Sequence, residues 1–247
     1  MKLALFADIH SNLEAITACL AHARGLGADR YAFLGDLVGY GADPVAVLEL
    51  IEEHAAMGAI VVLGNHDAAA LGRPDDTLSS AAKTAIAWTQ SRIGAAQRDF
   101  LESLPLVVRD DNILFVHASA AAPEQWIYVT SRREAGESLR AGNADYVFSG
   151  HVHEQKLYYL GAGGQATPFH PVPGTPIPVE KNRQWLAIVG SAGQPRDRNN
   201  KACYAFTDLE RSRLTFFRVA YDHDAAAKKV RAAGLPERFA RRLERGT

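Results

Sequence analysis

Two patterns of hydrophobic and polar positions, one typical of strands and one of helices, alternate along the first half of the chain. Short β-rich runs occupy residues 2–9, 31–41 and 59–67. Between them, residues 13–23 and 45–56 place apolar side chains at helical spacing. Asp43 followed by Pro44 is a candidate N-cap and first-turn proline for the second helix. This alternation predicts βαβ units, with a parallel sheet covered by helices.

The second half changes character after His153. Before it, residues 79–104 predict one or two helices ended by Pro105. Two further strands, at 112–119 and 145–153, flank a helical segment near 131–141. The β-rich runs that follow are separated by turns alone, which predicts antiparallel hairpins, and they lie at 156–160, 184–193, 201–210 and 213–221.

Two other segments complete the pattern. Residues 161–178 are rich in Gly and Pro and predict a surface loop. Residues 222–245 predict one or two helices broken near 234–236, with a basic face that we interpret as solvated surface. We expect a single domain over 1–247, with a C-terminal helical extension from about 222 to 247.

Composition excludes several classes of protein. Hydrophobic residues make up 47% and charged residues 22% of the 247, typical of a soluble globular protein. The net charge of −1, with no basic stripe, disfavours a nucleic-acid partner. Two distant cysteines indicate a reducing cytoplasm, and no apolar run approaches the roughly 20 residues that span a bilayer. No feature of the sequence indicates an oligomeric state.

Polar residues recur where the apolar runs end. Five runs each deliver a carboxylate, carboxamide or imidazole at the carboxyl end of a predicted strand, and these residues are Asp8, His10, Asp36, Asn65, His117, His151 and His153. In open α/β sheets ligands bind at this edge. Singly, each residue has an ordinary explanation, such as a helix-capping aspartate or a core histidine. Their convergence instead predicts a common site.

The donor set indicates metal ions. Mixed oxygen and imidazole donors suit divalent transition metals, here Mn, Fe, Zn, Ni or Co. Seven ligands exceed the needs of one ion but fit two ions that share a bridging carboxylate. Because residues two apart in an extended segment point the same way, Asp8 and His10 reach one site. Gly35, Gly64 and Gly150 precede ligands, and we expect sharp turns and close backbone approach there.

These residues stand in five motifs: Asp8-Ile9-His10, Gly35-Asp36, Gly64-Asn65-His66-Asp67, His117 and Gly150-His151-Val152-His153. In this order they resemble the calcineurin-like metallophosphoesterases, and the segment 190–197 resembles the compact bacterial branch of that family. The resemblance implies an α/β fold, a four-layer α-β-β-α sandwich of two packed mixed β-sheets flanked by helices. It also implies a dinuclear metal-dependent hydrolase.

The same resemblance implies a role for each motif residue. One ion is held by Asp8, His10 and His153, the other by Asn65, His117 and His151, with Asp36 bridging both. His66 faces the substrate phosphate, and with Asp36 it forms the expected catalytic pair. A hydroxide bridging the two ions would then attack phosphorus.

The second motif departs from the protein-phosphatase branch. That branch continues G-D-x-V-D-R-G, whereas residues 35–41 here read G-D-L-V-G-Y-G. The missing aspartate and arginine argue against a Ser/Thr protein phosphatase and leave the partner of His66 open. Asp67 is a candidate for that role or for helix capping.

Candidate substrate-binding residues are Asn12, Tyr40 and Arg196. Arg196 lies in the loop 194–198, where Arg198 is a second candidate to clamp phosphate and where pairing with Asp197 is the alternative. Trp126 and Tyr128 are candidates for an aromatic wall.

The sequence therefore predicts a phosphodiesterase that cleaves a small nucleotide-like or organic phosphate, with manganese among the candidate metals. Alternatives within the enzyme class are a phosphomonoesterase and a dinucleoside polyphosphate hydrolase. An alternative of another class is a non-catalytic metal-binding scaffold with the same fold. Retention of every ligand position and of His66 favours the enzyme.

Overall fold

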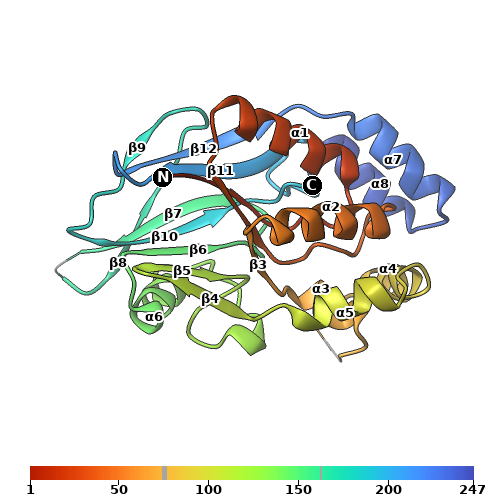
Figure 1. Ribbon diagram of the computed structural model, residues 1–247, viewed down its shortest axis with the longest axis horizontal. Coiled ribbons are helices and arrows are strands. Elements are labelled where there is room, and N and C mark those ends of the chain that lie inside the picture. The colour runs from red at the N-terminus through yellow and green to blue at the C-terminus, as the bar shows by residue number, and fades with distance from the viewer. Residues whose placement is uncertain (74–76, 162) are drawn as a thin grey trace.

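Two mixed β-sheets packed face to face form the centre of the molecule (Figure 1). The computed structural model describes residues 1–73, 77–161 and 163–247. The first sheet contains β1 (Lys2–Phe6), β2 (Arg30–Leu34), β3 (Ile60–Val62), β9 (Ile177–Pro178), β11 (Ala202–Asp208) and β12 (Arg213–Val219). The second contains β4 (Val107–Asp110), β5 (Ile113–Val116), β6 (Tyr146–Ser149), β7 (Gln155–Leu160), β8 (Ala166–Phe169) and β10 (Gln184–Val189). Their orders are β3-β2-β1-β11-β12-β9 and β4-β5-β6-β10-β7-β8.

Helices cover the outer faces of both sheets, which completes four layers and confirms the predicted fold class. On the first sheet lie α1 (Leu13–Gly25) and α2 (Pro44–Ala56), and α5 (Ala95–Ser103) packs in the same layer. The second sheet is covered by α6 (Arg132–Gly142), which begins with a capping box between Ser131 and Glu134. Between the sheets, alternate residues of each strand interdigitate, among them Leu5, Phe115 and Phe216.

The sheet pairings confirm the two halves predicted from the sequence. Strand β1 runs parallel to β2, and β2 runs parallel to β3, with α1 and α2 as the crossovers. The later strands form antiparallel pairs, β7 with β10 and β11 with β12. Strand β10 also runs parallel to β6, so this second sheet is mixed too.

Three expectations were wrong in detail. The sequence pattern missed β4, and the predicted loop 161–178 contains two short strands, β8 and β9, although its residue 162 lies outside the described residues. Asp43 occupies the N-cap position of α2, but its side chain makes no capping bond and instead accepts a hydrogen bond from Lys229 at 2.9 Å. The contact with Lys229 of α7 therefore takes the place of the capping bond that was expected of the Asp43 side chain.

The C-terminal segment forms a helical hairpin of α7 (His223–Ala232) and α8 (Glu237–Arg245), broken where the sequence predicted. Its apolar face packs with α4 (Ser80–Gln90) and Tyr40, burying Phe239 and Leu243 among others. Lys229 pairs with Glu14 at 2.5 Å and with Asp43 at 2.9 Å, which ties α7 to α1 and α2. In Figure 1 the hairpin lies beside α1 and α2, at the same end of the molecule as α4.

Candidate functional site

The seven predicted ligands converge at the carboxyl ends of strands from both sheets. They follow β1, β2 and β3 of the first sheet and β5 and β6 of the second, with Asn65 and His66 in the short helix α3 (Asn65–Ala70). All seven are buried, and none exposes more than 4% of its surface. The structure therefore brings together every residue in the predicted set, although their roles as ligands stay predictions.

The first cluster contains Asp8, His10, Asp36 and His153. The Nε2 atoms of His10 and His153 lie 3.1 Å apart. Asp8 Oδ1 lies 3.5 Å from His153 Nε2, and Asp36 Oδ2 lies 3.6 Å from His10 Nε2. Two carboxylate oxygens and two imidazole nitrogens thus point at one small volume.

The second cluster contains Asp36, His117 and His151, with Asn65 beside it. His117 Nε2 lies 3.1 Å from His151 Nδ1, 3.3 Å from Asn65 Oδ1 and 3.5 Å from Asp36 Oδ1. Asp36 therefore belongs to both clusters, with one carboxylate oxygen facing each. This is the division into two groups that the resemblance implied.

The arrangement of lone pairs fits a cation. In the first cluster, His10 Nδ1 lies 3.1 Å from the Val38 carbonyl oxygen, and His153 Nδ1 lies 2.6 Å from that of Gln194. A carbonyl only accepts hydrogen bonds, so each Nδ1 carries the proton and donates it. In neutral rings the facing Nε2 atoms are then both unprotonated acceptors, beside the carboxyl groups of Asp36 and of Asp8, whose pKa burial raises to about 8. Such a set is repulsive alone and favourable around a divalent ion.

Burial and charge set the protonation of these groups in the metal-free protein. Burial lowers the pKa values of His10 and His153 well below the ordinary value, which keeps both rings neutral. Burial opposes the charge on Asp36 too, but the neighbouring His117 holds the pKa of Asp36 well below its ordinary value. Burial would lower the pKa of His117, yet the Asp36 charge raises it to about 9. Burial and His117 lower the pKa of His151 to about 3.

The backbone is strained at the same positions. Five of the predicted ligands have left-handed φ angles of 50–67°, namely Asp8, His10, Asp36, His151 and His153. For non-glycine residues this conformation costs on the order of 1–3 kcal/mol each and persists where the surroundings impose it. Such strain is concentrated at functional sites in proteins.

Hydrogen bonds between the strand-end loops impose this backbone. The His10 amide donates to the Asp36 carbonyl at 2.9 Å, which joins the loops after β1 and β2. The His151 amide donates to Asp8 Oδ2 at 2.9 Å, which joins the two sheets. Of the three glycines expected here, Gly35 makes the sharp turn, at φ 80°, while all three allow close approach of neighbouring atoms.

Known proteins with a similar sequence identify the family of this chain. A family model described as the calcineurin-like phosphoesterase superfamily domain matches residues 1–212. The chain belongs to this superfamily. An uncharacterized protein of Methanocaldococcus jannaschii is 33% identical over 252 residues, covering 98% of this chain and 96% of that protein. A metallophosphoesterase from Sphaerobacter thermophilus has a crystal structure with TM-score 0.88 and 34% identity, covering 100% of this chain and 99% of that one.

A hypothetical protein from Pyrococcus horikoshii OT3 shares the fold. Its structure has TM-score 0.78 at 21% identity and covers 100% of this chain and 98% of that one.

In this superfamily domain, the residues of the GNHD motif form the start of α3. The Asp67 carboxylate accepts hydrogen bonds from the amides of Val38 and Gly64, both at 3.0 Å. Asp67 therefore anchors the start of this helix to the loop after β2.

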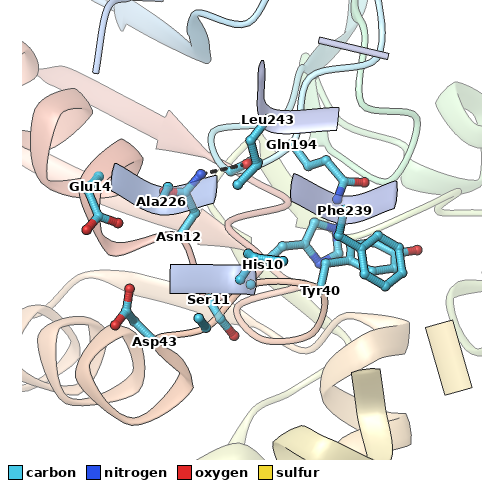
Figure 2. A pocket seen from close by; sticks show the side chains of 14 residues that line it. His10, Ser11, Asn12, Glu14, Tyr40, Asp43, Gln194, Ala226, Phe239 and Leu243 are labelled. Carbon is cyan, nitrogen blue, oxygen red and sulfur yellow. Dashed lines mark hydrogen bonds between the residues drawn. The ribbon is translucent and has the colours of Figure 1, made fainter. Parts of the chain in front are cut away.

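The phosphoesterase domain places His66 against the first cluster. Its amide donates to Asp36 Oδ1 at 2.8 Å, and its ring centroid lies 4.8 Å from that of His10. Tyr40 lies 4.4 Å from the His66 ring and 4.5 Å from the His10 ring. On its far side Tyr40 contacts Phe239 of α8 at 4.7 Å. Figure 2 shows His10, Tyr40 and Phe239 together along a cavity that α1, α7 and α8 also line.

The other predicted substrate-binding residues have diverse surroundings. Asn12 caps α1, accepting from the Ala15 amide at 3.1 Å and donating to the Gly193 carbonyl at 2.8 Å, so its side chain is used within the fold. Arg196 is half-buried and donates to the Tyr40 hydroxyl at 3.5 Å. Asp197 pairs with Arg218 rather than with either neighbouring arginine. Arg198 is exposed.

Two aromatic residues flank the second cluster. The ring of Tyr128 stacks on that of His151 at 3.9 Å, and Trp126 meets His117 edge-on at 5.9 Å. Tyr128 is 48% exposed, so its ring also borders solvent. Both residues therefore lie at the cluster, as the predicted aromatic wall requires.

Sequence reasoning missed Gln194 and Arg242. The Gln194 carbonyl fixes the proton of His153, and its side-chain oxygen accepts from Arg242 Nη1 at 3.2 Å. Arg242 belongs to the basic face of the last helix, which we interpreted as solvated surface, but it is half-buried at the site. The arginine-rich pattern of that helix was the available signal.

Proposed function

We propose that this protein is a dinuclear metal-dependent phosphoesterase that cleaves small nucleotide-like or organic phosphodiesters. The observation that carries the proposal is the pair of buried clusters sharing Asp36, in the first of which the unprotonated Nε2 atoms of His10 and His153 face each other beside carboxyl oxygens. Proposed ligands of one ion are Asp8, His10 and His153, and of the other Asn65, His117 and His151. The donor set accepts Mn, Fe, Zn, Ni or Co.

The bound ions would supply a nucleophilic water at neutral pH and neutralise charge on the phosphoryl oxygens. The chain orients the ligands that hold them. Backbone carbonyls of Val38, Leu34 and Gln194 fix the Nδ1 protons of three histidines, so that Nε2 is available for coordination. The His66 amide holds Oδ1 of Asp36 by donating to it at 2.8 Å.

We assign proton transfer or transition-state stabilisation to His66. Its ring lies against His10 and Tyr40, close to the first cluster but outside both. A histidine in this position can protonate the leaving oxygen, a contribution of about a hundred- to ten-thousandfold. Arg196 and Tyr40, which contact each other at the rim, are the proposed substrate-binding residues.

We also infer a reducing, cytoplasmic location. Cys19 and Cys203 are both free and buried, and burial raises the pKa of each thiol. Separately, the described residues contain no helix with the length and apolarity needed to cross a bilayer.

Hydrolysis assays test the proposed activity. Metal-stripped protein is reloaded in turn with Mn, Ni, Co and Zn, and turnover of bis-p-nitrophenyl phosphate is compared with that of p-nitrophenyl phosphate. We expect metal-dependent turnover with the diester preferred. Faster monoester cleavage would replace the diesterase assignment, and binding of two ions without turnover of either ester would favour the scaffold.

A further inference from the structure

The C-terminal hairpin brings a second arginine to the edge of the candidate site. This hairpin lies beyond the residues 1–212 that the superfamily model matches. Arg242 of α8 donates from Nη1 to Gln194 Oε1 at 3.2 Å, and Arg196 donates from Nη2 to the same oxygen at 3.2 Å. Two guanidinium groups therefore meet at one carboxamide oxygen.

Neither arginine is neutralised within the described part of the chain. Two other arginines of the hairpin, unlike Arg238 and Arg245, have a carboxylate partner among the described residues: Arg231 pairs with Glu237 at 2.9 Å, and Arg241 pairs with it at 3.4 Å. For Arg196 and Arg242, no carboxylate of a described residue lies within ion-pair distance. The Arg196 Nε is also buried without an acceptor among those residues. Two adjacent cationic groups without a counter-ion favour binding of an anion.

Partial burial strengthens this interpretation. Burial, together with the like charge of Arg196, lowers the pKa of Arg242, so the two groups repel each other in the absence of an anion. Gln194, the shared acceptor, is 1% exposed and holds both side chains in place. The hairpin itself is fixed by Phe239, whose ring packs on Tyr40. Phe239 lies one helical turn before Arg242.

The arginine pair is connected to the first cluster through a single residue, Gln194. Gln194 connects them, since its backbone oxygen accepts from His153 while its side chain accepts from both arginines. Tyr40 separates His10 from α8 on the other side. A group bound by the pair would therefore lie next to the phosphate at the ions, not on it.

We propose that Arg196 and Arg242 form a subsite for a second phosphoryl group of the substrate. The natural substrate then carries an anionic phosphate beside the phosphate ester that is cleaved. A phosphoryl group suits the pair better than a carboxylate, because it offers three oxygens and up to two charges to two planar donors. This inference rests on the proposed phosphoesterase function.

A matched pair of esters tests the subsite. The substrates are thymidine 5′-(p-nitrophenyl phosphate) and its 3′-phosphorylated analogue, and the readout is the ratio of their kcat/KM values. We expect wild-type protein to prefer the analogue and Arg242→Gln to lose about tenfold or more of that preference, the scale of one charge-assisted hydrogen bond. Arg241→Gln, on the exposed side of the same helix, should keep the preference.

A binding measurement separates failure of the subsite from failure of the activity. Thymidine 3′,5′-bisphosphate is titrated calorimetrically into metal-free wild-type, Arg242→Gln and Arg241→Gln proteins. Weaker binding only in Arg242→Gln supports the subsite, even if no ester is turned over with any metal. Equal binding by all three proteins, or an unchanged ester preference in Arg242→Gln, overturns it. An Arg242-dependent affinity without Arg242-dependent preference would assign the pair to free phosphate instead of substrate.

Discussion

Gly150→Ala tests whether close packing between the two sheets positions the candidate ligands. Gly150 lies outside the positive-φ glycines, so alanine is compatible with its backbone conformation and the effect is steric. A Cβ at this position would lie 2.5 Å from the Ala7 Cβ and 2.8 Å from Asp8 Oδ2. Ordinary carbon–carbon contacts are about 3.5–4.0 Å, so the β1 end must move by about 1 Å.

That displacement has three consequences. Overpacking should lower the free energy of unfolding of the metal-free protein by about 1–3 kcal/mol. Moving Asp8 lengthens its bonds from the His151 amide, now 2.9 and 3.1 Å, and should weaken metal binding about 10- to 100-fold. A misplacement near 1 Å should also lower turnover about a hundredfold.

Urea unfolding, calorimetric titration with Mn²⁺ and hydrolysis of bis-p-nitrophenyl phosphate measure these three effects. Gly163→Ala is the matched control, because its Cβ would meet no atom within 4 Å. If Gly150→Ala bound metal and turned over substrate like the control, the tight contact would not position Asp8, and the reasoning would be refuted.

Three further changes probe other parts of the site and fold. Asp36→Asn keeps a side chain suited to the left-handed backbone but removes the charge shared by both clusters. The affinity for both metal ions should fall about a hundredfold or more, and activity should vanish. Asp111→Asn, at an exposed position with the same φ of 52°, is the control and should leave metal affinity and activity unchanged. His66→Ala should retain both ions by calorimetry and lose about 10²- to 10⁴-fold in kcat; an unchanged kcat removes it from the mechanism. Backbone amides of Thr130 and Ser131 lower the pKa of Glu134 below its ordinary 4.5, so this stabilisation is present above pH 4.5 and is lost as pH falls through the lowered pKa. Glu134→Gln, which retains an acceptor, should show a smaller decrease in unfolding free energy from pH 6 to pH 3 than wild type, and equal decreases would contradict the assignment.

The strand-end residues were predictable because two simple regularities combine there. Alternating β and helical patterns fix a parallel arrangement, and parallel strands present their carboxyl ends at one edge. Asp8, Asp36 and His117 each follow such a strand, so their proximity could be inferred without coordinates. The division into clusters around Asp36 came from the family resemblance.

Features that depend on a partner outside the segment itself were not predictable in this way. Strands β8 and β9 form only because β7 and β12 offer pairing edges to short segments of a Gly/Pro-rich stretch. Similarly, Arg242 reaches Gln194 only because α8 packs on Tyr40. Local periodicity within one segment carries no information about its partner; Arg242 and Gln194, for example, are 48 residues apart in the chain.

The order of strands in the first sheet has a consequence for biosynthesis. Strand β1, which leads to Asp8 and His10, lies between β2 and β11, so its second neighbour is residues 202–208 near the other end of the chain. A nascent chain still attached to the ribosome before this point has only one side of β1 paired. The second sheet, which supplies His117, His151 and His153, likewise needs β10 beside β6. A chain synthesised only up to residue 201 therefore lacks an assembled centre, and any hydrolytic activity should appear only after β11 has been made.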